Sequence, residues 1–142
     1  MNVYIEGRIR NKKLVYGWVG MLLNILKINR LKRDLIIEFV TECDGRVLGY
    51  CWGDKDEVTI QISREHFDRK LSFLEMMKCL THEMVHARQI FRGQLTYNGL
   101  SKIWKGEVSS HSYEDSPWEI EAYELEEKIF SEWFPFHAPF KN

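Results

Sequence analysis

The motif His82-Glu83-Met84-Val85-His86 lies inside an apolar-periodic segment that runs from Leu71 to Phe91. On the helix that this periodicity predicts, the two histidines leave the same face with their Cβ atoms about 6 Å apart. A single Zn²⁺ can bind both imidazoles, because its bonds to nitrogen are about 2.0–2.1 Å long. Glu83 lies roughly 100° further round the helix and can reach a water molecule without binding the metal. The motif therefore predicts hydrolysis, in which Glu83 takes a proton from the water and passes it to a leaving amine.

The alternative is a pair of partly exposed helix histidines without a metal. The chain has five histidines in 142 residues, so the motif arises by chance in roughly one such chain in a few hundred. At about 100° per residue, large apolar side chains of the segment gather on one side: Phe73, Met77, Leu80, Met84 and Phe91. His82 and His86 fall almost opposite. The segment therefore predicts a helix with a core face and a separate histidine face that forms the floor of a cleft.

The composition is typical of a folded single domain, which we expect to span residues 1–142. Hydrophobic residues make up 44% of the chain and aromatic residues 13%, enough to build a core at this length. The three cysteines are odd in number and irregularly spaced, which excludes a disulfide framework and favours a reducing, cytoplasmic location. Cys43 and Cys51 flank a predicted hairpin, where buried free thiols are favoured over a redox pair.

Positive charge is concentrated at the N-terminus. Residues 1–33 hold eight Lys/Arg against Glu6 alone, a net of +7, whereas residues 34–142 hold twelve against twenty Asp/Glu, a net of −8. Such a segment can attract nucleic acid or anionic lipid, but a solvated face that pairs with acidic surface of the same domain is favoured. The apolar stretch Leu14–Ile28 is too short to span a bilayer and no cleavage pattern follows it. It predicts a packed core helix, and we expect no membrane association.

Alternating apolar residues predict a small sheet. The expected strands are Val3–Ile9, Asp34–Glu42, Arg46–Trp52 and Val58–Ile62, with a further short strand within Ile103–Val108. Asp44-Gly45 predicts a hairpin that joins the second and third strands, and Gly53–Asp56 predicts the next turn. Residues 63–69 are expected to connect to the motif helix with one helical turn, 97–100 to form a turn, and Gly93 to end the motif helix.

A second long helix is predicted to begin at Ser116 and to end near Phe134. Ser116-Pro117-Trp118-Glu119 has serine at the N-cap, proline at N1 and glutamate at N3, which is a full capping box.

This helix also offers a third metal ligand, which a catalytic zinc requires besides a water position. No histidine follows His86 at the spacing of the extended zincin motif. Of the helix glutamates, Glu119 and Glu126 flank the apolar stripe, whereas Glu124 and Glu127 point away from it. A capping box explains Glu119 without any metal, so Glu126, Glu121, Glu114 and His111 remain alternatives.

The two motifs together, His-Glu-Met-Val-His and Pro-Trp-Glu-Ile-Glu-Ala-Tyr some thirty residues later, resemble the small glutamate-ligand zinc peptidases, the gluzincins. The similarity is to compact phage and bacterial domains of the SprT-like and ImmA/IrrE-like kinds. In those families the first glutamate of E-x-x-A on the downstream helix binds zinc. The resemblance therefore implies His82, His86 and Glu119 as zinc ligands and Glu83 as the catalytic glutamate.

The resemblance also implies an α+β zincin-like fold, with an N-terminal helix, a small antiparallel sheet of about three strands and two helices that clasp zinc. It implies that a peptide substrate adds to an edge strand, which would be Val58–Ile62. Tyr123 departs from the pattern, since many relatives have Asp or Asn there. SprT-like proteins usually take a third histidine, which keeps His111 as an alternative ligand.

Groups that stabilise charge on the cleaved carbonyl are less defined by the sequence. His111, Tyr113 and Tyr123 are candidates, although an ordinary surface or core role is favoured for each. Cys79 lies three residues before His82 on the same face, where a packed thiol is favoured over a ligand.

The sequence thus predicts a monomeric, zinc-dependent metallopeptidase that acts on a protein or peptide. One alternative is a non-enzymatic binding module of the same fold. Another is a nucleic-acid-associated SprT-like protease that is recruited through the basic N-terminal segment.

Overall fold

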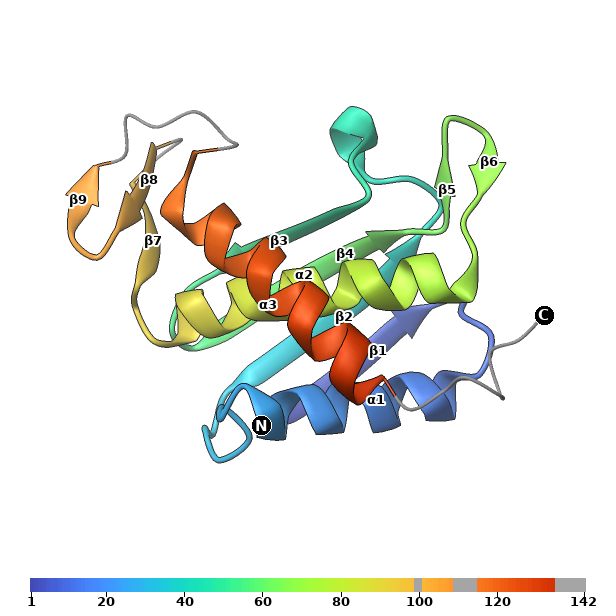
Figure 1. The fold of residues 1–142 in the computed structure, drawn as a ribbon, viewed down its shortest axis with the longest axis horizontal. Helices are drawn as coiled ribbons and strands as arrows, with labels where there is room; N and C mark the ends of the chain where they lie inside the picture. Colours follow the sequence, from blue (N-terminus) through green and yellow to red (C-terminus); the bar gives the residue numbers. More distant parts are fainter. Residues whose placement is uncertain (99–100, 109–114, 135–142) are drawn as a thin grey trace.

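The computed structural model describes residues 1–98, 101–108 and 115–134. Within these ranges the chain is a mixed α+β protein, as expected, with a four-stranded main sheet, two small sheets and three α-helices (Figure 1). The main sheet consists of β1 (Asn2–Gly7), β2 (Asp34–Val40), β3 (Gly49–Gly53) and β4 (Glu57–Ser63). The helices are α1 (Lys12–Ile25), α2 (Phe73–Phe91) and α3 (Pro117–Trp133). None of these described helices is both long and apolar enough to cross a bilayer.

The main sheet has the order β1-β2-β4-β3, with β1, β2 and β4 parallel and β3 antiparallel to β4. The prediction of a small antiparallel sheet of about three strands was therefore wrong. Helix α1 connects β1 to β2, and such a crossover brings the two strands side by side in parallel. The core faces of β2 and β4 are both fully buried, through residues such as Ile37 and Ile60 at 0% exposure. The strand order places β2 and β4 in the interior of the sheet, each with a neighbour on both sides.

The predicted hairpin between Asp34–Glu42 and Arg46–Trp52 does not form, because β4 lies between β2 and β3. A 3-10 turn at Asp44–Arg46 reverses the chain there instead. Val58–Ile62 is consequently not an edge; the edge strand on this side is β3. The turn predicted at Gly53–Asp56 is confirmed, since it joins β3 to its antiparallel partner β4.

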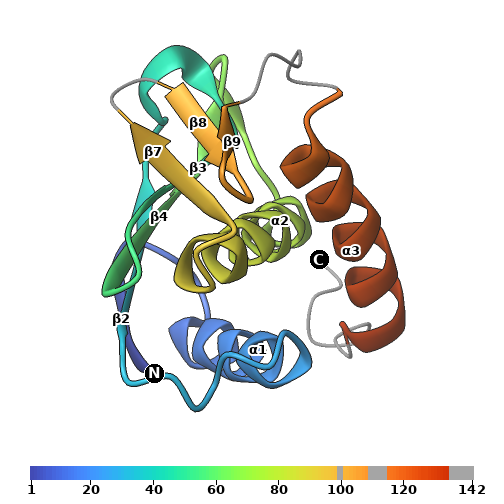
Figure 2. The ribbon, with the colours of Figure 1, turned by 90° about the vertical axis from the view of Figure 1, so that its left-hand side faces the viewer.

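Helix α2 lies at the centre of the molecule. One side of it packs on the sheet beside α1, and α3 crosses its other side (Figure 2). The predicted histidine face is therefore covered by α3, and His82 and His86 are only 7% and 6% exposed. Ser72 and Glu75 form a capping box at its start that the sequence analysis missed, and Gly93, at φ +72°, follows its end as predicted.

The remaining strands form a hairpin and a three-stranded sheet. Residues 63–69 contain no helical turn; β5 (Glu65–His66) pairs with β6 (Arg69–Lys70) there. After α2, β7 (Leu95–Asn98), β8 (Ser101–Trp104) and β9 (Glu107–Val108) form an antiparallel sheet, which confirms strand structure within 103–108. The central residues of the turn predicted at 97–100 lie outside the described residues.

Helix α3 begins at Pro117, the predicted N1 position, and ends at Trp133, one residue before the predicted end. The predicted capping box is wrong, because the Ser116 side chain makes no capping hydrogen bond. The Glu119 side chain contacts His82 and His86 of α2. The apolar stripe of α3 is buried, including Trp118 and Ala122, the latter at 0% exposure.

Candidate metal centre

Helices α2 and α3 bring together His82, His86 and Glu119, whose ligand atoms lie within 4.8 Å of one another. His82 Nε2 is 3.0 Å and His86 Nε2 3.1 Å from Glu119 Oε1. All three side chains are buried. Two imidazole nitrogens and one carboxylate are the ligand set of a three-protein-ligand zinc site, so the cluster could hold a metal ion.

The Nδ1 atom of each imidazole, on the side away from Glu119, contacts another polar side chain. His86 Nδ1 is 2.8 Å from Gln89 Oε1, and His82 Nδ1 is 2.9 Å from Glu126 Oε1. Gln89 Nε2 donates to the Trp118 carbonyl at 3.0 Å, which identifies the other end of this amide as the oxygen. Each Nδ1 must therefore be the protonated nitrogen that donates.

This tautomer leaves the Nε2 lone pair of each neutral imidazole directed at the Glu119 carboxylate. Three electron-pair donors then converge on one small buried space, which is unfavourable unless a cation lies between them. A proton on an imidazole or a metal ion can fill that role, and the donor set fits a metal ion.

The charges of the cluster are strongly coupled. Burial lowers the pKa of His82, but hydrogen bonds to Glu119 and Glu126 outweigh this effect and raise it to about 9. Burial raises the pKa of Glu119, but its hydrogen bonds to His82 and His86 outweigh this effect and lower it to about 2. Without a metal the site thus retains a proton on His82 opposite an ionised Glu119. A metal ion that binds here must displace that proton.

Glu83 lies outside the cluster and faces the edge strand β3. A Cβ added to Gly49 would lie 3.0 Å from Glu83 Oε2 and 2.7 Å from Cys79 Sγ. The missing side chain at Gly49 therefore makes room for the carboxylate. Burial raises the pKa of Glu83, although the two neighbouring histidines partly oppose this. Glu83 consequently binds a proton more readily than an exposed glutamate does.

The cluster and Glu83 line a cavity of about 790 Å³ between β3 and α3. Exposed apolar side chains contribute to its lining: Val47, Leu48, Tyr50 and Tyr123, each at least 40% exposed. The β7–β8 hairpin closes one end of the cavity through Tyr97, whose hydroxyl donates to the Cys51 carbonyl of β3 at 3.3 Å. An open, partly apolar cavity beside a sheet edge has the character of a ligand-binding cleft.

The rival ligands among the described glutamates have other partners. Glu126 contacts the Nδ1 side of His82, and Glu121 accepts a hydrogen bond from Gln89 at 3.1 Å. Glu127 pairs with Lys78 at 2.6 Å, and Glu124 is exposed. The candidates His111, Tyr113 and Glu114 lie outside the described residues.

The remaining candidates lie beside the cluster. The Tyr123 ring packs against His82 with 4.4 Å between ring centroids and lines the cleft. Its part in stabilising a carbonyl stays a prediction. Cys79 Sγ lies close to Gly49, as the Glu83 carboxylate does, and Cys79 is not in the cluster, consistent with the packed thiol that was expected. Burial raises the pKa of this thiol.

Sequence reasoning missed Gln89 and Gly49. Gln89 follows His86 by three residues, a spacing at which side chains on a helix meet, so it could have been found. The role of Gly49 depends on pairing across the sheet, for which the sequence carries no local signal.

Comparison of the chain with protein-family models, curated proteins and solved structures finds no match.

Proposed function

We propose that this protein is a zinc-dependent metallopeptidase with a zincin-like arrangement of its two motif helices. The observation that carries the proposal is that His82 Nε2, His86 Nε2 and Glu119 converge on one point. Glu83 lines the same cleft as these three residues. The gluzincin resemblance implies that a catalytic glutamate lies beside the zinc ligands in this way.

His82, His86 and Glu119 would hold the metal, for which the two imidazoles and one carboxylate favour Zn²⁺. The bound ion would supply a Lewis acid that acidifies water and polarises the carbonyl of the substrate. Glu126 and Gln89 orient the two imidazoles so that each Nε2 faces inwards.

Glu83 is the proton carrier of the proposal. Its burial and raised pKa suit a group that accepts a proton from the attacking water and then donates it to the leaving amine. Gly49 supports this role, because any side chain there would displace the Glu83 carboxylate.

Strand β3 offers a backbone edge for the substrate. Leu48 O accepts from Ser63 N at 2.9 Å and Asp54 N donates to Glu57 O at 2.9 Å. In an antiparallel pair the residues between these points alternate, so Gly49 and Cys51 direct their backbone groups away from β4. The Cys51 carbonyl already accepts from the Tyr97 hydroxyl, which leaves the edge at Gly49 for a substrate. A peptide that adds beside Gly49 would pass the cluster, and the exposed apolar rim favours apolar side chains in that peptide.

The decisive experiment measures metal content and cleavage on the same preparation. The purified chain should contain one zinc per molecule and cleave an unstructured protein such as casein, and 1,10-phenanthroline should abolish cleavage. Glu83→Gln should keep zinc and lose about 10²–10⁴-fold in rate, the range typical of a general base. Glu124→Gln, an exposed glutamate of α3, is the matched control and should behave as wild type.

If the chain takes up no stoichiometric metal, the proposal of a metallopeptidase is wrong. A chain that binds zinc but yields no chelator-sensitive cleavage is instead the non-enzymatic binding module. Cleavage that survives Glu83→Gln would mean that the role of this residue is wrongly assigned.

A further inference from the structure

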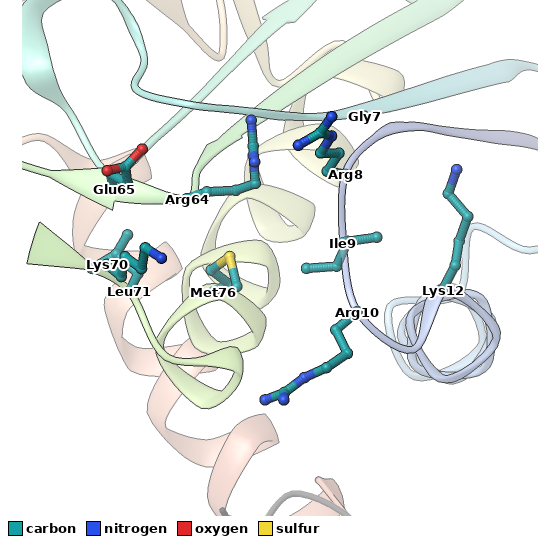
Figure 3. A pocket seen from close by; sticks show the side chains of 10 residues that line it. All are labelled: Gly7, Arg8, Ile9, Arg10, Lys12, Arg64, Glu65, Lys70, Leu71 and Met76. Carbon is teal, nitrogen blue, oxygen red and sulfur yellow. The ribbon is translucent and has the colours of Figure 1, made fainter.

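A second cavity of about 520 Å³, with no lining residue in common with the first, lies beside the N-terminus of α2. Two segments far apart in the sequence face each other across it: residues 8–12, between β1 and α1, and residues 64–71, between β4 and α2 (Figure 3). Strands β1, β2 and β4 all end on this side, because Gly7, Phe39 and Ile62 are in register. The crevice outside the carboxyl ends of parallel strands is where α/β sheets bind ligands.

The lining carries an excess of positive charge. It contains five cationic side chains and one carboxylate: Arg8, Arg10, Lys12, Arg64 and Lys70, with Glu65. In the described part of the chain, Arg8, Arg64 and Lys70 form no ion pair, whereas neighbouring Arg69 pairs with Glu75 at 3.1 Å. Glu65 lies directly across the β5–β6 pair from Lys70, but the lining keeps an excess of cations, which repel one another. An anion in the cavity would remove this repulsion.

Arg64 is prepared to bind such an anion. Its Nη2 donates to Thr41 Oγ1 at 3.1 Å, and this hydrogen bond restrains the guanidinium. Its Nε is buried and has no hydrogen-bond partner among the described residues. A buried N–H donor without an acceptor is costly, and a guanidinium donates to phosphate oxygens through two parallel N–H groups. That buried Nε is closed to a cavity ligand, but Arg64 lines the cavity, so a bound phosphate would pair with the charge of its guanidinium there.

The start of α1 also favours a bound anion. Its N-cap Asn11 is in the left-handed region and makes no side-chain capping hydrogen bond. Its first residue is Lys12, and its first turn contains no acidic residue, an unfavourable arrangement at the positive end of a helix dipole. An anion near Lys12 would offset both effects.

The floor of the cavity is apolar and consists of Ile9 and Leu71, one from each basic segment, and Met76 of α2, which lies between the two segments (Figure 3). Leu71 and Met76 are buried at 9% and 8% exposure. Inorganic phosphate would leave this floor uncovered, whereas a flat ring attached to the phosphate would cover it. The volume lies within the range of about 300–1,000 Å³ that is usual for small-molecule sites.

We propose that this cavity binds a small aromatic phosphate of the size of a nucleoside monophosphate. The phosphate lies among Arg8, Arg64 and Lys70, and the ring lies on Ile9 and Met76. This site shares no residue with the metal cluster, so the proposal stands or fails independently of the peptidase activity.

The test is isothermal titration calorimetry of the chain of residues 1–142 with AMP, adenosine, inorganic phosphate and an unphosphorylated single-stranded oligonucleotide. We expect AMP to bind more tightly than inorganic phosphate, and adenosine to bind weakly or not at all. Arg8→Gln and Arg64→Gln should each weaken AMP binding at least about tenfold, as expected when a charge-assisted hydrogen bond is lost. Lys13→Gln is the matched control, since it removes a charge from the same segment outside the cavity lining. The methyl resonances of Ile9 and Met76 should shift when AMP binds.

Several results would overturn this assignment. Equal affinity for AMP and inorganic phosphate would contradict the role of the apolar floor. Unchanged AMP binding in Arg8→Gln, an exposed position that tests the site even if Arg64→Gln does not fold, would contradict the phosphate position. Binding of the oligonucleotide alone, weakened equally by Lys13→Gln, would identify a diffuse nucleic-acid surface instead. Failure of AMP to bind would end the proposal.

Discussion

The substitution Gly49→Ala tests the position of Glu83 without altering any proposed metal ligand. The new Cβ would lie 2.7 Å from Cys79 Sγ and 3.0 Å from Glu83 Oε2, whereas ordinary contacts begin at 3.4 Å. The sulfur has to withdraw by about 0.7 Å and the carboxylate by about 0.4 Å to restore such contacts. Crowding of a packed site typically costs about 1–3 kcal/mol of unfolding free energy. A misplacement of about 1 Å can lower a catalysed rate about a hundredfold.

We therefore expect kcat/KM for a fluorogenic peptide to fall roughly tenfold to a hundredfold in Gly49→Ala, with zinc content unchanged. Gly20→Ala is the matched control, because nothing lies within 4 Å of a Cβ added there. In the interior of α1 that change should stabilise the protein by about 0.5–1 kcal/mol and leave activity intact. Cys79→Ala in the Gly49→Ala background should recover part of the lost stability, since it removes the closest contact.

Wild-type kcat/KM in Gly49→Ala would refute the reasoning, because Glu83 would then not depend on the space at β3. Loss of zinc together with activity would refute it as well, since β3 would then support the metal ligands and not the proton carrier. Assays at saturating zinc separate these two results.

Three further outcomes follow from the site and from the start of α2. Glu119→Ala should lose stoichiometric zinc while its far-UV circular dichroism stays native; retention of zinc would mean that another ligand completes the site. Glu126→Gln should weaken zinc affinity about 10–100-fold, because it removes the charged acceptor of His82 Nδ1, and competition with a chelator of known affinity measures this loss. Arg69 and the capping box lower the pKa of Glu75 from 4.5 to about 2. Because the pKa is lower in the folded state, this stabilisation is present above about pH 4.5 and is lost as the pH falls towards 2. Urea titrations should therefore show wild type more stable than Glu75→Gln at pH 6 and equal to it near pH 2, with a difference at pH 6 of at most about 1 kcal/mol since the pair is partly exposed.

Much of the local structure could be predicted from the sequence. Periodicity identified α2 and the opposed positions of its apolar and histidine faces, and Gly93 marked its end. The turn at Gly53–Asp56 was also predicted correctly. These features depend on residues within a few positions of one another, where helix periodicity and turn chemistry act directly.

The order of the strands could not be predicted in the same way. Asp44-Gly45 has the sequence of a hairpin turn, yet the strands on its two sides are separated by β4. Pairing between distant strands depends on which faces the helices cover, and local sequence does not record this. The edge strand was therefore assigned to Val58–Ile62 when it is β3.

Glu119 shows the same division within the site. As the third residue of α3 it fits a capping box, and the sequence left several other ligands open. The structure turns its carboxylate towards His82 and His86, and Ser116 makes no capping hydrogen bond. The packing of α3 on α2 decides between the two roles, because a carboxylate forms its bonds where the nearest donors are held.

By itself, the sequence determined the histidine pair, the glutamate between them and the helix that carries all three, because their spacing along one helix fixes their relative positions. Only the tertiary structure decided which carboxylate meets the histidines, which strand borders Glu83 and where two basic segments enclose a second cavity. These features join residues that are dozens of positions apart, and the free energy that brings such residues together comes from burial of the whole core.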